Sequence, residues 1–161
     1  GIFDERPGQV RRVTSGHLLA SGPTGWLTVD CDDQHRCAMT VVSRADFRRR
    51  PLATPPDRFE AITGVIAPDG HTAALLADGP GGFTSLHLVD LDTGQDRETG
   101  ISVDQPRSLS ASAVAWSPDS RLVFLVDSTG SVQVVTAATA QATRLDAELP
   151  DLDQIAFRSG G

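Results

Sequence analysis

Three residue types are missing from this 161-residue chain, which contains no Lys, Asn or Tyr. Without Asn the chain has no acceptor for N-linked glycosylation. All 14 basic residues are Arg, and together with plentiful Ala, Gly and Pro this bias is typical of GC-rich bacterial genomes. Aromatic residues make up only 5% of the chain, whereas 39% of its residues are hydrophobic, which is enough to fill the core of one domain.

The chain also lacks long apolar stretches. No apolar run approaches the roughly 18 residues that would indicate a membrane span, so we expect no transmembrane segment in this sequence. The first ten residues, GIFDERPGQV, do not show the basic and then apolar pattern of a signal peptide. We therefore expect that any targeting segment is absent from this sequence.

The net charge of −7 disfavours nucleic acid as a partner, because such binding needs a basic face that neutralises phosphates. The charge is also uneven. Residues 1–58 hold nine Arg against seven acidic residues, whereas residues 59–161 hold five Arg against fourteen. One end of the molecule should therefore be much more acidic than the other.

Catalytic motifs are absent as well. The sequence has no G-x-S-x-G, H-E-x-x-H, P-loop or dinucleotide fingerprint. Its four histidines, His17, His35, His71 and His87, show no spacing that suggests a shared site, and we expect each on the surface or in a loop. We predict no catalytic residue, no metal and no cofactor, although a triad assembled across repeats would leave no sequence pattern.

An internal repeat organises what is present. Three apolar segments end in Asp, namely WLTVD at Asp30, AALLAD at Asp78 and LVFLVD at Asp127, with spacings of 48 and 49 residues. The apolar segments that follow begin at residues 39, 86 and 132, with spacings of 47 and 46. Two independent landmarks thus give nearly the same period, which predicts a repeat architecture.

Each repeat reads as four short strands joined by tight turns. Pro-Asp turns occur at 67–70 (APDG) and 117–120 (SPDS), and a DLDTG turn lies at 90–94. Four strands in a unit of roughly 40 to 50 residues are typical of a β-propeller blade. The same segments resemble the SPDG and DLxTG signatures of TolB-like and WD40-like bacterial propeller repeats, although the first repeat has ASGPTG where Pro-Asp-Gly would fall.

We therefore predict an all-β fold: a partial propeller of about three four-stranded antiparallel blades plus extra terminal strands. The predicted parts are an outer strand of a preceding blade at 8–13, blades at 15–54, 59–103 and 109–147, and an inner strand of a following blade at 152–161. Closed propellers usually contain four to eight blades, so this arc would have open edges. The remaining blades of a longer protein, or a second copy closing a ring head to tail, could cover them.

Cys31 and Cys37 flank the sequence DDQHR between two predicted strands. Across a hairpin, five intervening residues can bring the two Cβ atoms to disulfide distance. A disulfide would indicate an oxidising, exported location, whereas two free thiols would indicate the cytoplasm. A zinc site that uses His35 as well is disfavoured, because no second ligand pair is present.

Two further groups of residues are candidates for binding a ligand or partner. Asp30, Asp78 and Asp127 end equivalent strands and would line one rim, although Asp at a turn also accepts local backbone hydrogen bonds. The segment RADFRRRP at 44–51 could bind phosphate, carboxylate or an acidic protein, or could protect an outer edge by its charge. Its candidate residues are Arg44, Arg48, Arg49 and Arg50.

The function expected from these features is display of recognition loops by rigid blades. We predict a non-catalytic binding or scaffold domain, exported or on the cell surface, that presents loops to a protein partner or ligand. The resemblance also leaves an enzyme-associated propeller open, because related propellers serve as scaffolds, as exported binding proteins and as gating domains of some peptidases. In that case the segment would gate access to a hydrolase or bind a ligand.

Overall fold

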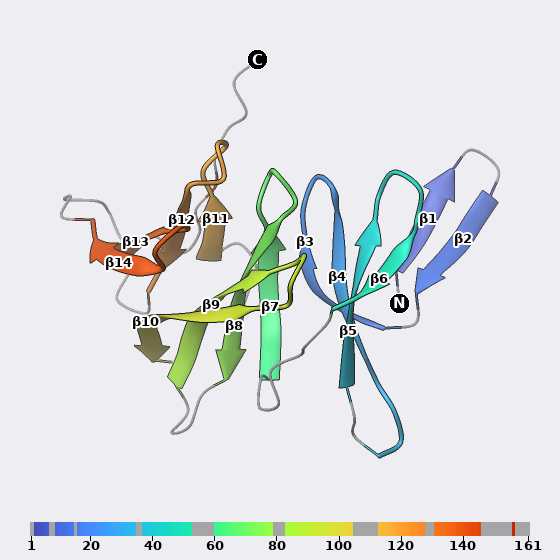
Figure 1. The fold of residues 1–161 in the computed structure, drawn as a ribbon, viewed down its shortest axis with the longest axis horizontal. Helices are drawn as coiled ribbons and strands as arrows, with labels where there is room; N and C mark the ends of the chain where they lie inside the picture. The colour runs from blue at the N-terminus through green and yellow to red at the C-terminus, as the bar shows by residue number, and fades with distance from the viewer. Residues whose placement is uncertain are drawn as a thin grey trace.

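A computed structural model of the chain describes residues 2–6, 9–14, 16–34, 37–52, 60–78, 83–104, 113–127, 131–145 and 156. These residues form strands joined by tight turns (Figure 1). The strands are β1 (Ile2–Arg6), β2 (Gln9–Thr14), β3 (His17–Ser21), β4 (Gly25–Cys31), β5 (Cys37–Ser43), β6 (Arg49–Pro51), β7 (Glu60–Ile66), β8 (Thr72–Asp78), β9 (Phe83–Asp90), β10 (Asp96–Asp104), β11 (Val114–Trp116), β12 (Leu122–Val126), β13 (Val132–Thr136) and β14 (Gln141–Arg144).

The strands form three four-stranded antiparallel blades, which confirms the predicted fold class. Blade 1 is β3–β6, blade 2 is β7–β10 and blade 3 is β11–β14, each paired in chain order. The innermost strands β3 and β7 also pair in parallel, Ala20 with Gly64 and Ser21 with Val65, which joins blades 1 and 2 into one eight-stranded sheet. In Figure 1 the blades stand side by side along the longest axis of the molecule.

The core lies between the blades, and the middle blade is covered on both faces. Strand β8 shows this best, since side chains alternate between the two faces of a strand. Its Ala73 and Leu75 pack toward blade 1, whereas the next residue in each case, Ala74 and Leu76, packs toward blade 3. All four side chains are fully buried. A strand that is apolar on both faces therefore needs a neighbouring blade on each side.

Blade 3 packs on blade 2 through one of its faces. The sequence pattern predicts that Val114, Val123, Leu125 and Val134 point into this interface. The first three lie in the shared core, but Val134 is only half-buried, and Val135 takes the core position with no exposed surface. The reason is strand register: Val135 pairs with Val123, which places Val134 on the opposite face of the sheet.

The ends of the chain differ in what the structure describes. The predicted outer strand at 8–13 overlaps β2, which pairs antiparallel with β1 in a separate two-stranded sheet. The predicted strand at 152–161 lies outside the described residues, apart from Ala156. The predicted blade limits stay predictions. Within the described part of the chain, no helix is long and apolar enough to cross a membrane.

Candidate functional site

A disulfide closes the loop between β4 and β5. Cys31 ends β4 and Cys37 begins β5, so the two residues face each other in the strand register and their sulfur atoms are bonded at 2.00 Å. Inside the loop, the Asp32 carboxylate accepts the backbone N–H of Gln34 at 2.9 Å. Figure 1 shows this hairpin projecting from the edge of blade 1 opposite to the β3–β4, β5–β6 and β7–β8 turns. The bond therefore fixes the base of an exposed loop.

The three predicted rim aspartates lie at or next to the ends of equivalent strands but differ in their surroundings. The Asp30 carboxylate lies 3.4 Å from the Arg49 guanidinium, and Asp78 is exposed at the end of β8. Asp127 accepts the backbone N–H of Ser131 at 3.0 Å. Among the described residues, no three His, Cys, Asp or Glu side chains are arranged to hold a metal ion.

The arginines of segment 44–51 have different polar partners. The Arg44 guanidinium lies 4.3 Å from the centre of the Trp26 ring, and its Nε donates to the Gly22 carbonyl at 2.7 Å. The Arg48 Nε lies 3.2 Å from an Asp46 carboxylate oxygen in an exposed ion pair. A cation over an aromatic face and a surface ion pair are separate local contacts.

The next two arginines point to opposite faces of blade 1 because they are neighbours on strand β6. Arg49 reaches Asp30 and the Thr14 hydroxyl on one face. Arg50 reaches blade 2 on the other face, where it donates to the Leu91 carbonyl at 2.6 Å. The arginines of this segment are close in the sequence, but their side chains contact separate parts of the structure.

Blade 1 contains a turn that the sequence comparison missed. Residues 43–47 form the counterpart of the DLDTG turn at 90–94 and of the turn at 136–140. In each, the fifth residue has a positive φ, 58° at Phe47, 77° at Gly94 and 56° at Ala140. Each of these residues also donates its N–H to the carbonyl of the first residue of the turn. The three positions lie one repeat period apart, and this spacing could have revealed the turn in the sequence. The turn was missed because Phe47 stands where the second blade has Gly.

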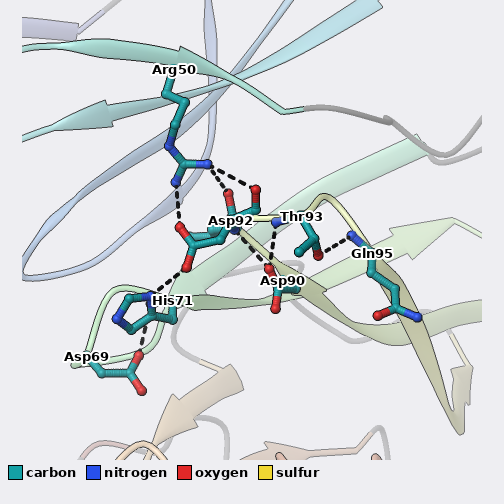
Figure 2. A network of polar contacts seen from close by, with 8 residues as sticks. Arg50, Asp69, His71, Asp90, Asp92, Thr93 and Gln95 are labelled. Atoms are coloured by element: carbon teal, nitrogen blue, oxygen red, sulfur yellow. Dashed lines mark hydrogen bonds and ion pairs between the residues drawn. The ribbon is translucent and has the colours of Figure 1, made fainter.

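The DLDTG turn of blade 2 is the centre of a polar network between blades 1 and 2 (Figure 2). Arg50 from blade 1 donates to an Asp92 carboxylate oxygen at 3.1 Å. The other carboxylate oxygen of Asp92 lies 2.7 Å from His71 Nδ1. Asp90 accepts the backbone N–H groups of Asp92 and Thr93 at 2.9 and 2.8 Å. This turn therefore anchors side chains from two blades.

Charges in the network change the pKa of its members. The hydrogen bond from His71 to the Asp92 carboxylate, and the negative charge of that group, raise the pKa of His71 above 6.5. The backbone hydrogen bond from Thr93 lowers the pKa of Asp90 below 3.8. Both shifts favour the charged form of the group concerned.

A similar contact between an arginine and the following blade recurs at the interface of blades 2 and 3. Arg97 of β10 occupies the position in blade 2 that Arg50 occupies in blade 1, and its guanidinium donates to the Ala138 carbonyl of blade 3 at 2.9 Å. Ala138 in turn is the counterpart of Asp92. Two interfaces thus share one feature: an arginine of the outermost strand binds the turn before the outermost strand of the following blade.

One hydrogen-bonded chain in blade 2 has the order of a catalytic triad. The Ser85 hydroxyl lies 2.9 Å from His87 Nε2, and both Asp96 carboxylate oxygens lie 3.0 Å from His87 Nδ1. The expectation that every histidine lies on the surface or in a loop is wrong for His87, which is in β9 with its side chain only 14% exposed. Alternation along the strand places Ser85 and His87 on one face, which no short motif describes.

Ser85 occupies a poor position for acyl transfer. It lies within β9 and is paired on both sides, with Ala77 and with Ser102, so the backbone there is committed to the sheet. Acyl transfer needs free N–H donors aimed at an oxyanion. We interpret the chain of bonds as a satisfied polar network that ties β9 to β10.

No protein-family model and no curated protein matches this sequence. Solved structures do. The β-propeller domain of the Trilobed protease from Pyrococcus furiosus matches with a TM-score of 0.54 at 15% identity, over 80% of this chain and 41% of that one. TolB from Acinetobacter baumannii matches with a TM-score of 0.56 at 16% identity, over 87% of this chain and 35% of that one.

The chain is part of a β-propeller. A structure from a study of two prolyl endopeptidases is also similar, with a TM-score of 0.51 at 14% identity, over 75% of this chain and 20% of that one. This partial propeller thus spans less than half the length of each of these proteins. At such low identities the similarity establishes the fold and leaves the function to the residues of this chain.

Proposed function

We propose that this partial propeller is a non-catalytic binding module of an exported or cell-surface bacterial protein, and that the β4–β5 loop is a contact point for a protein partner. The observation that carries the proposal is the Cys31–Cys37 disulfide at the base of that loop. Such bonds persist in oxidising compartments. A loop held at its base also loses less conformational entropy when it binds.

The loop sequence DDQHR holds two aspartates against one arginine, which favours a partner with basic groups. Asp32 and Asp33 follow Cys31 directly and are exposed, and Asp30 lies just before it. Asp78 is exposed at the end of the equivalent strand of blade 2. Acidic groups on one rim would attract a basic surface and speed association.

Site-specific photocrosslinking tests this function. A photoreactive amino acid replaces Asp33 in the loop, and in a matched variant it replaces the exposed Ala138 in a turn of blade 3. In cells of the native host, we expect one discrete cross-linked species from position 33 and none from position 138. The double variant Cys31→Ser/Cys37→Ser should weaken that cross-link. Equal cross-linking from both positions, or none from position 33, would contradict the proposal.

A second candidate is the propeller segment of a peptidase, supported by the likeness to the Trilobed protease propeller and to a prolyl endopeptidase structure. In that role the blades would gate access to a hydrolase domain. The two functions differ in what the complete gene product does. Hydrolysis of short proline-containing fluorogenic peptides by that product, lost when its own hydrolase serine is replaced, would favour the second.

Self-association is one way in which the open arc could be completed. Further blades of a longer chain, or a second copy, would cover the faces at its ends. Light scattering coupled to size exclusion distinguishes a dimer from a 17.0 kDa monomer. A dimer whose mass does not fall on dilution would support closure by two copies, and a monomer at all concentrations would exclude it.

A further inference from the structure

A cavity of about 580 Å³ opens between blades 1 and 2 and is lined in part by Thr24, Asp46 and Gly70. These residues belong to the β3–β4, β5–β6 and β7–β8 turns, which Figure 1 shows at the edge opposite the disulfide loop. Its volume falls in the range of sites that bind small ligands, roughly 300 to 1,000 Å³. Val41 of blade 1 and Ile66 of blade 2 supply the apolar side chains at its base, and Leu91 lies fully buried beneath them in the core that joins the two blades. The cavity therefore has an apolar floor built by both blades.

The polar wall of the cavity comes from the β5–β6 turn of blade 1 and from the start of β6. Ser43, Asp46, Arg48, Arg49 and Arg50 all line the cavity, although the guanidinium of Arg49 pairs with Asp30 on the other face of blade 1. A hydrogen bond from the Ser43 hydroxyl lowers the pKa of Asp46, so this carboxyl group is ionised at neutral pH. Arg48, Arg50 and the ionised Asp46 thus line the same cavity as the apolar floor.

The two arginines differ in how firmly they are held. Arg50 donates to the Leu91 carbonyl and to Asp92, and this clamp recurs at the next blade interface, so its guanidinium has a fixed orientation. Arg48 is 88% exposed and pairs with Asp46, two residues earlier and itself 48% exposed. Exposed ion pairs contribute little, so a ligand anion can replace Asp46 as the partner of Arg48.

The repeat shows that blade packing does not require Arg48. Its counterparts are Gln95 in blade 2 and Gln141 in blade 3. The Arg48 carbonyl accepts the N–H of Ser43, as the Gln95 carbonyl accepts the N–H of Asp90. Because the equivalent positions in blades 2 and 3 carry an uncharged residue of similar length, the Arg48 side chain is available to bind a ligand.

We propose that this cavity binds a monocarboxylate with a short apolar body. Arg guanidinium groups pair bidentately with carboxylates, and the floor offers burial to a few apolar carbons. Asp46 and Asp92 near the entrance would repel a ligand of higher negative charge, and the arginines would repel a cation. Two sources share this chemistry: the C-terminal carboxylate of a peptide with an apolar last residue, and a free medium-chain fatty acid.

This site goes beyond the proposed function, because it lies at the other edge of the blades and needs no protein partner. Calorimetry of the 161-residue chain with two probes, octanoate and N-acetyl-alanyl-leucine, tests it, with the primary amide of each as the uncharged comparison. The amide keeps the apolar body and removes the charge. We expect at least one acid to bind with a Kd near or below about 1 mM, and its amide at least about tenfold more weakly.

Two matched variants test whether the charge of Arg48 holds the carboxylate. Arg48→Gln installs the residue found at both equivalent positions, so the blade should fold normally, and it should weaken acid binding about tenfold. Arg121→Gln removes an exposed arginine of blade 3 and should leave binding unchanged. Methyl NMR shifts of Val41, Ile66 and Leu91 report occupancy of the floor directly and do not depend on either variant.

The outcomes separate the two sources. Binding of the peptide alone assigns the site to peptide C-termini, binding of octanoate alone assigns it to fatty acids, and binding of both shows that the carboxylate dominates recognition. The proposal is overturned if neither acid binds, if the amides bind as well as the acids, or if Arg121→Gln weakens binding as much as Arg48→Gln does. Shifts confined to methyl groups outside the floor would also overturn it.

Discussion

Replacing Leu125 by Ala tests whether the blades pack as described. Leu125 is 1% exposed and lies in the core between blades 2 and 3, and on its own sheet it pairs with Val114 of β11. Removing a buried leucine side chain costs its transfer free energy plus that of the cavity left behind. We expect the free energy of unfolding to fall by about 3 kcal/mol.

The assay is equilibrium unfolding in urea together with thermal melting. For a domain of this size, a loss of about 3 kcal/mol lowers Tm by roughly 6 to 12 °C. Leu145→Ala is the matched control, because Leu145 is 42% exposed at the end of β14 and its loss should stay within about 0.5 kcal/mol. If Leu125→Ala also cost less than about 0.5 kcal/mol, the register of β12 and the packing of blade 3 on blade 2 would both be wrong.

Three other measurements probe separate features. The double variant Cys31→Ser/Cys37→Ser opens a loop with a sequence separation of 6. The chain-entropy model predicts that this lowers the free energy of unfolding by about 2 kcal/mol. Urea titration measures the change, and an unchanged midpoint would contradict the prediction. Because Asp92 raises the pKa of His71, this group's stabilisation is complete below pH 6.5 and is lost as pH rises through the folded-state pKa. His71→Gln should therefore lower Tm more at about pH 5.5 than at about pH 8, and an equal effect at both would show that the pair does not form. Ser85 should not react with a fluorophosphonate probe, and labelling by mass spectrometry would show that its network is a working nucleophile.

Much of the fold could be predicted from the sequence, because blades are local structures. Each strand pairs mainly with the next in the chain, so apolar runs separated by Pro-Asp and Gly turns are enough to define a four-stranded unit. The same locality made the Cys31–Cys37 pair predictable, since the two residues end adjacent strands of one hairpin. The first blade matched the repeat less well, because ASGPTG stands where Pro-Asp-Gly would fall and Phe47 occupies the positive-φ position that Gly94 fills in the second blade.

Contacts between blades could not be predicted in this way, because they join residues roughly one repeat apart in the chain. Arg49 and Arg50 are adjacent in the sequence, yet strand alternation sends them to opposite faces of the sheet, one to Asp30 and one to Asp92. Arginines that are adjacent in the sequence therefore pair with different carboxylates in the structure. Val134 shows the same limit, because a shift of one residue in strand register decides which face a side chain occupies.

The sequence by itself determined the repeat, the strands, the turns and the disulfide hairpin, since all of these depend on residues within one blade. Tertiary structure decided how neighbouring blades meet. It placed Arg50 of blade 1 against the His71–Asp92 pair of blade 2 and opened the cavity above Ile66. The physical reason is that short turns and alternating apolar residues specify pairing along a chain, whereas the relative placement of packed sheets depends on side chains that no local pattern relates.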